Sequence, residues 1–466
     1  MKDIRITEKE IVEKRDLRTE SGITFPGVPE HIRIRAEAKP EAGSRIRIEL
    51  WMPTADWNGD LAGIGNGGAA GSIPWFALAG PLCLGFAVVT TDMGTSAGPD
   101  CGIGNEAVWR DFGYRATHVM TEFAKEQVEQ YYGKTAKHAY FVGGSTGGQQ
   151  ALSEAQRFPE DYDGILACAP AYDRTALHLA FLWDWQHLNA SGVDAITPEQ
   201  EIRIRNALLE KYAELGDRRP GDDFFYWPNH IRVQREDLMG LGLTDPQIHA
   251  LLAVYRGAQD IYEPTLTPGS EASGLGIAHR CEKDRFAHDY FYLFRWVLGK
   301  DFDFEKFDFA RDGNKVREAL VPVLDASNPD LTAFRRRGGK LLLIHGTADP
   351  IIPMSSSIRY FEDVQRKMGN TADFFRLFLA PGMGHITGGP GVQDIVFGFP
   401  ATPKDEKHLG LLALKAWVQE NKAPDSLFPV AFKKDQPLSA FMPDGMSWER
   451  EIQPYGADRE TADTSV

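Results

Sequence analysis

One glycine-rich segment of the sequence has the residue pattern of an activated serine nucleophile. Ser145 lies in residues 143–147, GGSTG, which fit the G-x-S-x-G motif. A strand-like run at 138–142 precedes the motif and a helix-like run at 149–158 follows it, as the motif requires. Glycines two positions before and after the serine let strand and helix approach without Cβ clashes, and the sharp turn exposes the hydroxyl. The pattern predicts a nucleophile elbow, with an inert serine in a glycine-rich turn as the alternative.

A serine hydroxyl needs a base, and the base needs a carboxylate that orients it. His385 lies in a loop after the last predicted core strand, and Asp349 follows the buried strand-like run at 340–345. Both come after Ser145, in the order serine, acid, histidine. We therefore predict a catalytic triad of Ser145, Asp349 and His385, with Asp325 as the alternative acid. A turn aspartate that only caps backbone N–H groups is the structural alternative for Asp349.

Two backbone N–H groups must also converge on the oxyanion that develops during acyl transfer. We expect one from Thr146, the residue after the nucleophile, and one from the glycine-rich loop at 63–71, where Gly67 and Gly68 are placed for it. The same loop contains G-x-G-x-x-G, which in other contexts binds a dinucleotide. That alternative is weak, because Asp92 lies well beyond the ~20 residues at which a ribose-binding carboxylate is expected.

The elements that must position these residues alternate between strands and helices. Buried strand-like runs occur at 86–91, 138–142, 165–168, 340–345 and 374–379, and helical patterns at 105–132, 149–158 and 407–421. This alternation predicts a mostly parallel sheet with helices on both faces. Residues 33–50 alternate polar and apolar side chains, which predicts antiparallel strands with one solvated face.

The middle of the chain has a different character, with many aromatic residues, helical patterns and no clear buried strand. We interpret residues 173–320 as an inserted helical lid domain between two parts of an α/β core, residues 1–172 and 321–466. The tail after residue 424 is predicted to be irregular, with frayed last residues.

Composition excludes several classes of protein. Lys plus Arg number 51 and Asp plus Glu number 66, so the net charge of −15 opposes binding to nucleic acid or anionic membrane. None of the 4 cysteines stands in CxxC, the N-terminus lacks the apolar core of a secretory signal, and the longest apolar run, at 77–89, is shorter than the ~20 residues of a membrane span. We expect a cytoplasmic protein with free thiols and a small-molecule partner; the oligomeric state stays open.

Several motifs occur together along the chain. They are GNGGAAG at 65–71, GSTGGQQ at 144–150, EAQRFPEDYDGI at 154–165, NPDLTAF at 328–334, PGMGH at 381–385 and GGPG at 388–391. Over about residues 57–422 the sequence resembles the tannase and feruloyl esterase family of α/β-hydrolases. The resemblance implies an α/β-hydrolase fold and a serine esterase that needs no cofactor, with Ser145, Asp349 and His385 as its triad. It also implies a helical lid that shapes a pocket for phenolic acyl groups such as feruloyl or galloyl.

The sequence departs from this family at two places. Family members typically carry cysteines directly before the nucleophile and directly after the histidine, joined by a disulfide, whereas this chain has Gly144 and Ile386 there. The loss of that disulfide fits a reducing compartment. Family lids often bind calcium, but residues 215–223 lack the spacing of an oxygen-rich calcium loop, so we expect no metal. Both departures favour small aromatic esters or a metabolic intermediate over a cell-wall polymer.

Lid aromatics are candidate substrate contacts, and we single out Trp183, Phe225 and Trp227 together with Gly67 of the glycine-rich loop, although such aromatics more often form lid core. The predicted function is that of a serine carboxylic-ester hydrolase acting on aromatic or related small esters. A lactonase, amidase or acyltransferase would use the same triad, and a non-catalytic ligand-binding module on this fold is a further alternative.

Overall fold

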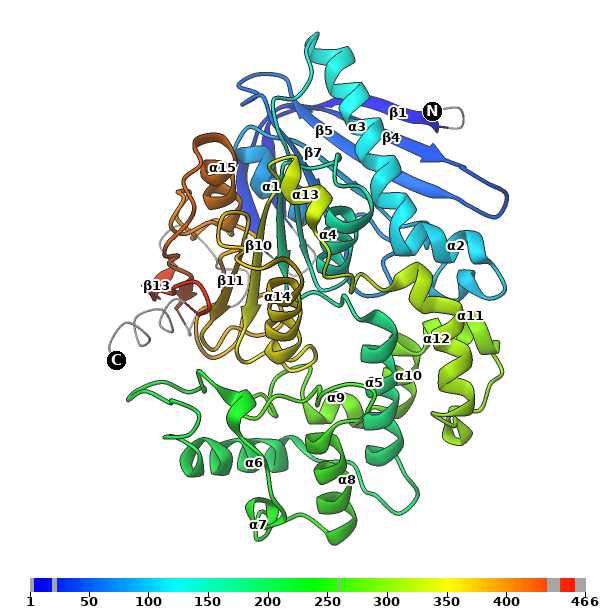
Figure 1. Cartoon of the computed structure of the whole chain (residues 1–466), viewed down its shortest axis with the longest axis vertical. Helices are drawn as coiled ribbons and strands as arrows, with labels where there is room; N and C mark the ends of the chain where they lie inside the picture. The colour runs from blue at the N-terminus through cyan, green and yellow to red at the C-terminus, as the bar shows by residue number, and fades with distance from the viewer. Residues whose placement is uncertain (1–3, 19–22, 259, 434–444, 457–466) are drawn as a thin grey trace.

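The computed structural model of the protein describes residues 4–18, 23–258, 260–433 and 445–456, and a 9-stranded sheet forms its centre (Figure 1). The strands of this sheet are β1 (Ile4–Val12), β4 (His31–Ala38), β5 (Ile46–Pro53), β6 (Leu61–Ile64), β7 (Ala87–Thr91), β8 (Ala139–Gly144), β9 (Gly164–Cys168), β10 (Lys340–Gly346) and β11 (Phe375–Ala380). Their order in space is β1-β4-β5-β7-β6-β8-β9-β10-β11. All neighbours from β7 to β11 run parallel, whereas β1, β4 and β5 pair antiparallel. The mostly parallel sheet predicted from the sequence is confirmed.

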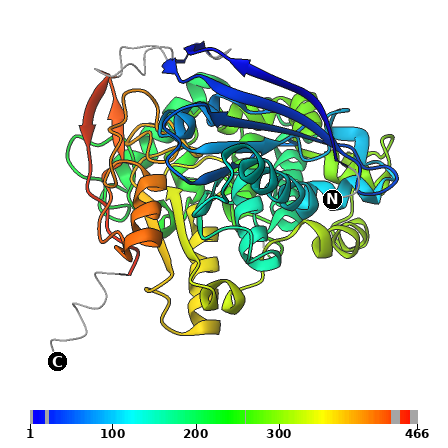
Figure 2. The ribbon, with the colours of Figure 1, turned by 90° about the horizontal axis from the view of Figure 1, so that it is seen from above.

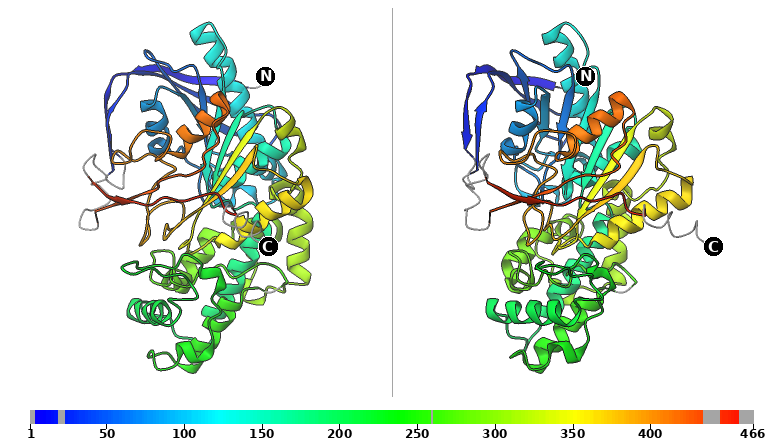
Figure 3. Two further views of the ribbon diagram at one scale, coloured as in Figure 1. Left: turned by 60° about the vertical axis from the view of Figure 1, so that its left-hand side comes forward. Right: turned by 90° about the vertical axis from the view of Figure 1, so that its left-hand side faces the viewer.

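Helices cover both faces of the sheet (Figure 3). The helices packed on it are α1 (Trp75–Cys83) and α15 (Gly410–Glu420) on one face, and α3 (Ala116–Tyr132), α4 (Thr146–Arg157) and α14 (Met354–Met368) on the other. Successive side chains of a strand point to opposite faces. In β10, Leu341 and Leu343 therefore join the core beneath α3, α4 and α14, while Leu342 and Ile344 join the core beneath α1 and α15.

The N-terminal strands agree with the sequence in pairing but not in exposure. Residues 33–50 form the antiparallel pair β4 and β5, as predicted. The expected solvated face is confirmed only in part, because Arg47 is exposed on it while Glu49 is only 2% exposed. The Glu49 carboxylate accepts hydrogen bonds from Arg33 Nε at 2.7 Å and from Trp75 Nε1 at 3.1 Å, so the approach to α1 covers part of that face.

The structure adds elements that the sequence did not predict. They include β1, β2 (Arg15–Arg18) paired with β3 (Thr24–Val28), and β12 (Val430–Phe432) paired with β13 (Met446–Glu449). The tail after residue 424 is thus not wholly irregular, because the β12–β13 ribbon packs beside α15 (Figure 2). The predicted helix at 105–132 is interrupted by a π-helical turn at Asp111–Arg115. The last residues, expected to fray, lie outside the described part of the chain.

A helical segment separates β9 from β10, and all of its helices except the last one, α13, gather at one end of the sheet (Figure 1). Its helices are α5 (Arg174–Leu188), α6 (Pro198–Lys211), α7 (Arg235–Leu238), α8 (Asp245–Arg256), α9 (Ile277–Cys281), α10 (Lys283–Tyr290), α11 (Tyr292–Leu298), α12 (Arg311–Leu324) and α13 (Thr332–Arg336). No strand interrupts it within the described residues. Part of it has a separate apolar core, with Leu208 and Leu251 at its centre. The domain boundaries at 172 and 320 stay predictions.

None of the helices in the described part of the chain is both long and apolar enough to cross a membrane.

Candidate active site

Ser145 occupies a strained turn between β8 and α4. Its backbone angles are φ 61° and ψ −118°, a conformation with positive φ that residues other than glycine rarely adopt. The turn lies close to the loop after β6, where a Cβ on Gly65 would come within 2.6 Å of Gly147 Cα. Only glycines allow this approach. The strand–turn–helix context that the motif predicts is therefore present.

Asp349 and His385 meet at the carboxyl ends of β10 and β11. His385 Nδ1 lies 2.8 Å from Asp349 Oδ2, and Asp349 is fully buried. The other carboxylate oxygen, Oδ1, accepts the N–H groups of Ile351 at 3.0 Å and Ile352 at 2.9 Å. Burial acts to raise the pKa of the Asp349 carboxyl, but the electrostatic interaction with His385 and hydrogen bonds from both neighbouring histidines outweigh it and hold this pKa below its usual range. The site thus keeps an ionised carboxylate behind the His385 imidazole.

The second of these histidines, His345, was not singled out from the sequence. It is fully buried in β10, and its Nε2 lies 3.5 Å from Asp349 Oδ2 and 2.9 Å from the carbonyl oxygen of Ile352. Its Nδ1 lies 2.7 Å from Ser357 Oγ. His345 is therefore a second histidine beside the carboxylate oxygen that faces His385.

The loops that carry Ser145 and His385 touch, although the two side chains form no hydrogen bond in the described structure. A Cβ on Gly144 would lie 2.8 Å from Ile386 Cγ2. These are the residues directly before the serine and directly after the histidine, and they stand where the family resemblance places a disulfide. The loops that carry the predicted nucleophile and the predicted base are therefore in direct contact next to both residues.

The alternative acid, Asp325, lies elsewhere. Its Oδ1 accepts hydrogen bonds from the backbone N–H of Thr175 at 3.0 Å and from the Thr175 hydroxyl at 2.9 Å. Burial and the neighbouring Asp173 carboxylate raise the pKa of Asp325. No described histidine bonds to it, so the geometry favours Asp349 as the orienting acid.

The two expected oxyanion donors are brought together as well. Thr146 Oγ1 donates a hydrogen bond of 2.8 Å to the carbonyl oxygen of Gly68. Within the described residues, neither the Thr146 N–H nor the Gly68 N–H has a hydrogen-bond partner. The N–H of Gly67, in contrast, donates to Asn66 Oδ1 at 2.9 Å and is already occupied. Of the two glycines, Gly68 is the one with a free donor.

A small cavity of about 40 Å³ opens beside Ser145. Its lining comes from the oxyanion loops, from the segment after β9, and from α5, α10 and α11, and includes Arg174, His178, Phe181, Tyr290 and Tyr292. Burial and the adjacent Arg174 charge lower the pKa of His178, and burial raises the pKa of Tyr290 to about 12. Apart from Phe181, which belongs to the aromatic-rich start of the segment, these residues were missed from the sequence, since no motif marks them.

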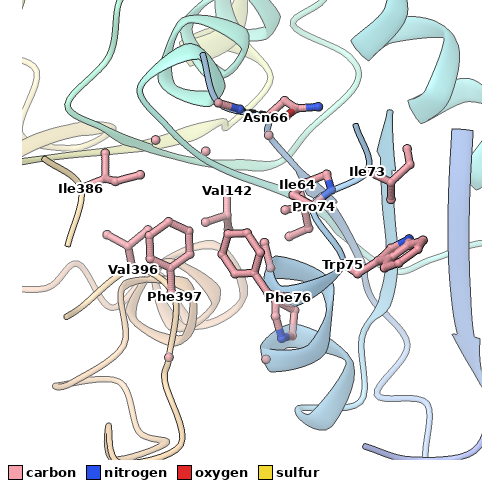
Figure 4. Close-up of a pocket in the computed structure, with 18 of the residues that line it drawn as sticks. Ile64, Asn66, Ile73, Pro74, Trp75, Phe76, Val142, Ile386, Val396 and Phe397 are labelled. Atoms are coloured by element: carbon pink, nitrogen blue, oxygen red, sulfur yellow. Dashed lines mark hydrogen bonds between the residues drawn. The ribbon is translucent and has the colours of Figure 1, made fainter. Parts of the chain in front are cut away.

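A much larger cavity, about 950 Å³, lies on the other side of the same turn (Figure 4). Its wall is mostly apolar and is formed by the approach to α1, by α1 itself and by the loop after His385; the rings of Phe76 and Phe397 lie side by side in Figure 4. Gly67 and Gly144 belong to its wall, but none of the three predicted triad residues does.

The three aromatic residues proposed as substrate contacts line neither cavity. Trp183 donates its indole N–H to the carbonyl oxygen of Ala253 at 3.1 Å. Phe225 is buried in the separate core of the helical segment, and Trp227 stacks on His230. Their role in substrate binding stays a prediction.

The described residues contain no group of three or more His, Cys, Asp or Glu side chains that could hold a metal ion. All 4 cysteines are free.

The sheet order and the reactive groups at its strand ends define an α/β-hydrolase. The chain matches the family model described as tannase and feruloyl esterase over residues 31–219 and 286–450. An uncharacterized esterase of Xanthomonas campestris is 30% identical over 471 residues, which cover 89% of this chain and 80% of that protein. Feruloyl esterase B of Aspergillus niger is 29% identical over 406 residues, covering 82% of this chain and 76% of that protein. The crystal structure of feruloyl esterase B from Aspergillus oryzae has the same fold, with a TM-score of 0.84 at 23% identity over 98% of this chain and 93% of that one. The chain belongs to the tannase and feruloyl esterase family and is a carboxylic ester hydrolase.

Proposed function

We propose that the protein hydrolyses small aromatic carboxylic esters, with Ser145 as nucleophile, His385 as general base and Asp349 as the acid that orients it. The observation that carries this proposal is the 2.8 Å contact between His385 Nδ1 and buried Asp349, placed on a loop that touches the strained turn of Ser145. With Nδ1 held by the carboxylate, Nε2 is left for the serine proton, because it has no hydrogen-bond partner among the described residues.

The reaction follows from these positions. Ser145 Oγ attacks the ester carbonyl carbon while His385 Nε2 takes the hydroxyl proton, and Asp349 stabilises the imidazolium that forms. The N–H groups of Thr146 and Gly68 receive the negative charge of the tetrahedral intermediate. His385 then protonates the departing alcohol, and a water molecule activated by the same imidazole releases the acid from Ser145.

An aromatic acyl group is supported by two observations. Phe181, Tyr290 and Tyr292 line the small cavity next to Ser145, and related chains are named feruloyl esterase B. An aromatic acid needs far more than 40 Å³, since ligand pockets usually enclose roughly 300 Å³ or more. We therefore propose that the helical segment acts as a lid, and that the part carrying Tyr290 moves outward to admit the substrate.

The four free cysteines lead us to propose a reducing compartment, such as the cytoplasm, as the place of action.

The test is a substrate panel measured on wild type and on Ser145→Ala. We expect wild type to hydrolyse methyl esters of ferulic and gallic acid, and we expect Ser145→Ala to lose at least about 10⁴-fold in kcat/KM. Ser153→Ala, which removes another serine hydroxyl on α4, is the matched control and should retain activity. Wild-type rates in Ser145→Ala would refute the proposal. Faster turnover of matched lactones, amides or acyl acceptors would leave the triad in place and change the bond it acts on.

A further inference from the structure

Arg174 is a buried cation next to Ser145 to which the steps above give no role. It is the first residue of α5, is 2% exposed, and lines the same small cavity as the serine. No carboxylate among the described residues lies within the 4.0 Å ion-pair distance of its guanidinium. Asp289, the one acid in the lining of this cavity, instead has His288 Nδ1 at 2.9 Å and Arg285 Nε at 3.8 Å. Burying a charge without a counter-ion costs folding free energy, so the presence of such a charge next to the serine indicates a function.

Four of the five N–H donors of this guanidinium have partners. Nη1 donates to Thr146 Oγ1 at 2.8 Å and to Gln149 Oε1 at 3.3 Å. Nη2 donates to the carbonyl oxygen of Gly68 at 3.0 Å and to the hydroxyl of Tyr292. The fifth donor, Nε–H, is buried and has no partner among the described residues. All of these partners are neutral, so the hydrogen bonds fix the guanidinium without cancelling its charge.

The contacts converge on one peptide group. The carbonyl oxygen of Gly68 accepts from Thr146 Oγ1 at 2.8 Å, from Arg174 Nη2 at 3.0 Å and from the Tyr292 hydroxyl at 3.4 Å. Gly68 has φ +54° and lies in a loop without helix or strand, where a Cβ would meet nothing within 4 Å. Other hydrogen bonds hold the neighbouring residues of this loop, such as the one of 2.7 Å from Thr95 Oγ1 to the carbonyl oxygen of Ala69. At Gly68 itself, the three donors fix the carbonyl oxygen relative to Thr146.

We propose that Arg174 is a positioning residue for the oxyanion hole: it holds Gly68 against Thr146, and its unneutralised charge favours the negative charge that develops on the ester oxygen. The inference rests on the proposed function. Preorganised dipoles and charges in a dry site stabilise a transition state without having to reorganise when the charge appears. The oxyanion then provides the negative partner that Arg174 lacks in the resting protein.

The experiment compares Arg174→Met, which keeps length and apolar bulk, with Arg174→Lys, which keeps the charge but loses the planar fork. We expect Arg174→Met to lower kcat on an aromatic methyl ester by on the order of 10²-fold with little change in KM, and Arg174→Lys to recover part of the loss. The inhibition constant of an arylboronic acid, which forms a tetrahedral adduct on serine, should rise in parallel, whereas that of the matching aromatic alcohol, which is neutral and forms no adduct, should not. Arg285→Met, which removes an exposed arginine of α10, is the control for loss of charge.

Tyr292→Phe tests the positioning of Gly68 without removing a charge. It removes one hydrogen-bond donor to the Gly68 carbonyl oxygen and should lower kcat only a few-fold. If Arg174→Met does not fold, Tyr292→Phe and Arg174→Lys together test the proposal. Retention of kcat within about 3-fold in folded Arg174→Met would overturn the proposal, and so would an equal loss of affinity for the boronic acid and the neutral alcohol. If wild-type hydrolysis does not depend on Ser145, the proposed function fails instead, which the Ser145→Ala measurement reports separately.

Discussion

Two cavities share the glycine-rich turn around Ser145. The larger one is mainly apolar, whereas the smaller one holds the reactive and charged groups. The large one, about 950 Å³, is bounded mainly by apolar side chains and by polar groups that already have partners, as Asn66 does through its contacts to Ser72, Thr91 and Gly67. The small one, about 40 Å³, contains the serine, the free N–H groups and the uncompensated charge of Arg174. A large cavity volume therefore indicates space for apolar groups, whereas polar groups without partners and a strained backbone indicate the site of the reaction.

The largest expected effect separates the two candidate acids behind the small cavity. Asp349→Asn should lower kcat/KM on an aromatic ester by about 10⁴-fold, because an amide leaves the imidazole in the wrong tautomer. Asp325→Asn should change it only a few-fold, since Asp325 bonds to Thr175 rather than to a histidine. Steady-state kinetics on both variants give the comparison, and the reverse ranking would make Asp325 the acid.

A matched pair of substitutions tests the contrast between the cavities directly. Leu177 lines the small cavity and Val396 the large one, and both side chains are buried. Leu177→Phe should lower kcat/KM on methyl ferulate by about 10-fold through lost space at the acyl group, whereas Val396→Phe should leave it within about 2-fold. Both substitutions overpack their surroundings to a similar degree, so thermal unfolding provides the stability control. A larger loss in Val396→Phe would move the acyl group into the large cavity.

The wall between the cavities offers a third test. An ideal Cβ on Gly144 lies 3.1 Å from Ile386 Cβ, close to the 3.5–4.5 Å that disulfides span. The double variant Gly144→Cys/Ile386→Cys should therefore form a disulfide when oxidised and gain about 2–4 kcal/mol in the free energy of unfolding. Thermal unfolding with and without dithiothreitol measures the gain. Failure to oxidise would show that the serine and histidine loops are further apart than the structure places them.

The smallest effect concerns stability in acid. The pKa of Asp349 is held below its ordinary value of 3.8, so ionised Asp349 contributes stability that is present above about that pH and is lost as pH falls further. The unfolding free energy of wild type should consequently fall more steeply below pH ~4 than that of Asp349→Asn. Urea denaturation from pH 7 down to pH 3 measures both slopes. Identical slopes would contradict the ion pair with His385.

The sequence predicts those features whose pattern lies within a short stretch of the chain. Ser145, Asp349 and His385 each follow a short buried strand, so chain order and turn residues were enough to nominate them. Arg174 and Tyr292 reach Gly68 across 106 and 224 positions, and only the tertiary fold of the helical segment brings them there. The same reason left β1 unpredicted: most of its residues are exposed, and its pairing with β4 includes surface ion pairs such as Glu8 with Arg35.

The aromatic residues of the helical segment show that a sequence pattern alone does not predict which side chains line the cavity. Trp183, Phe225 and Phe181 all occur in aromatic-rich sequence, yet only Phe181 lines the small cavity, because which side chains face Ser145 depends on packing far along the chain.

Covalent labelling with a fluorophosphonate, followed by peptide mapping, tests most directly whether Ser145 is the nucleophile and His385 its base. We expect a single adduct, on the peptide that contains Ser145, formed rapidly in wild type, slowly in His385→Ala and not at all in Ser145→Ala. An adduct on another serine, or equal labelling rates with and without the His385 imidazole, would contradict the assignment of these residues.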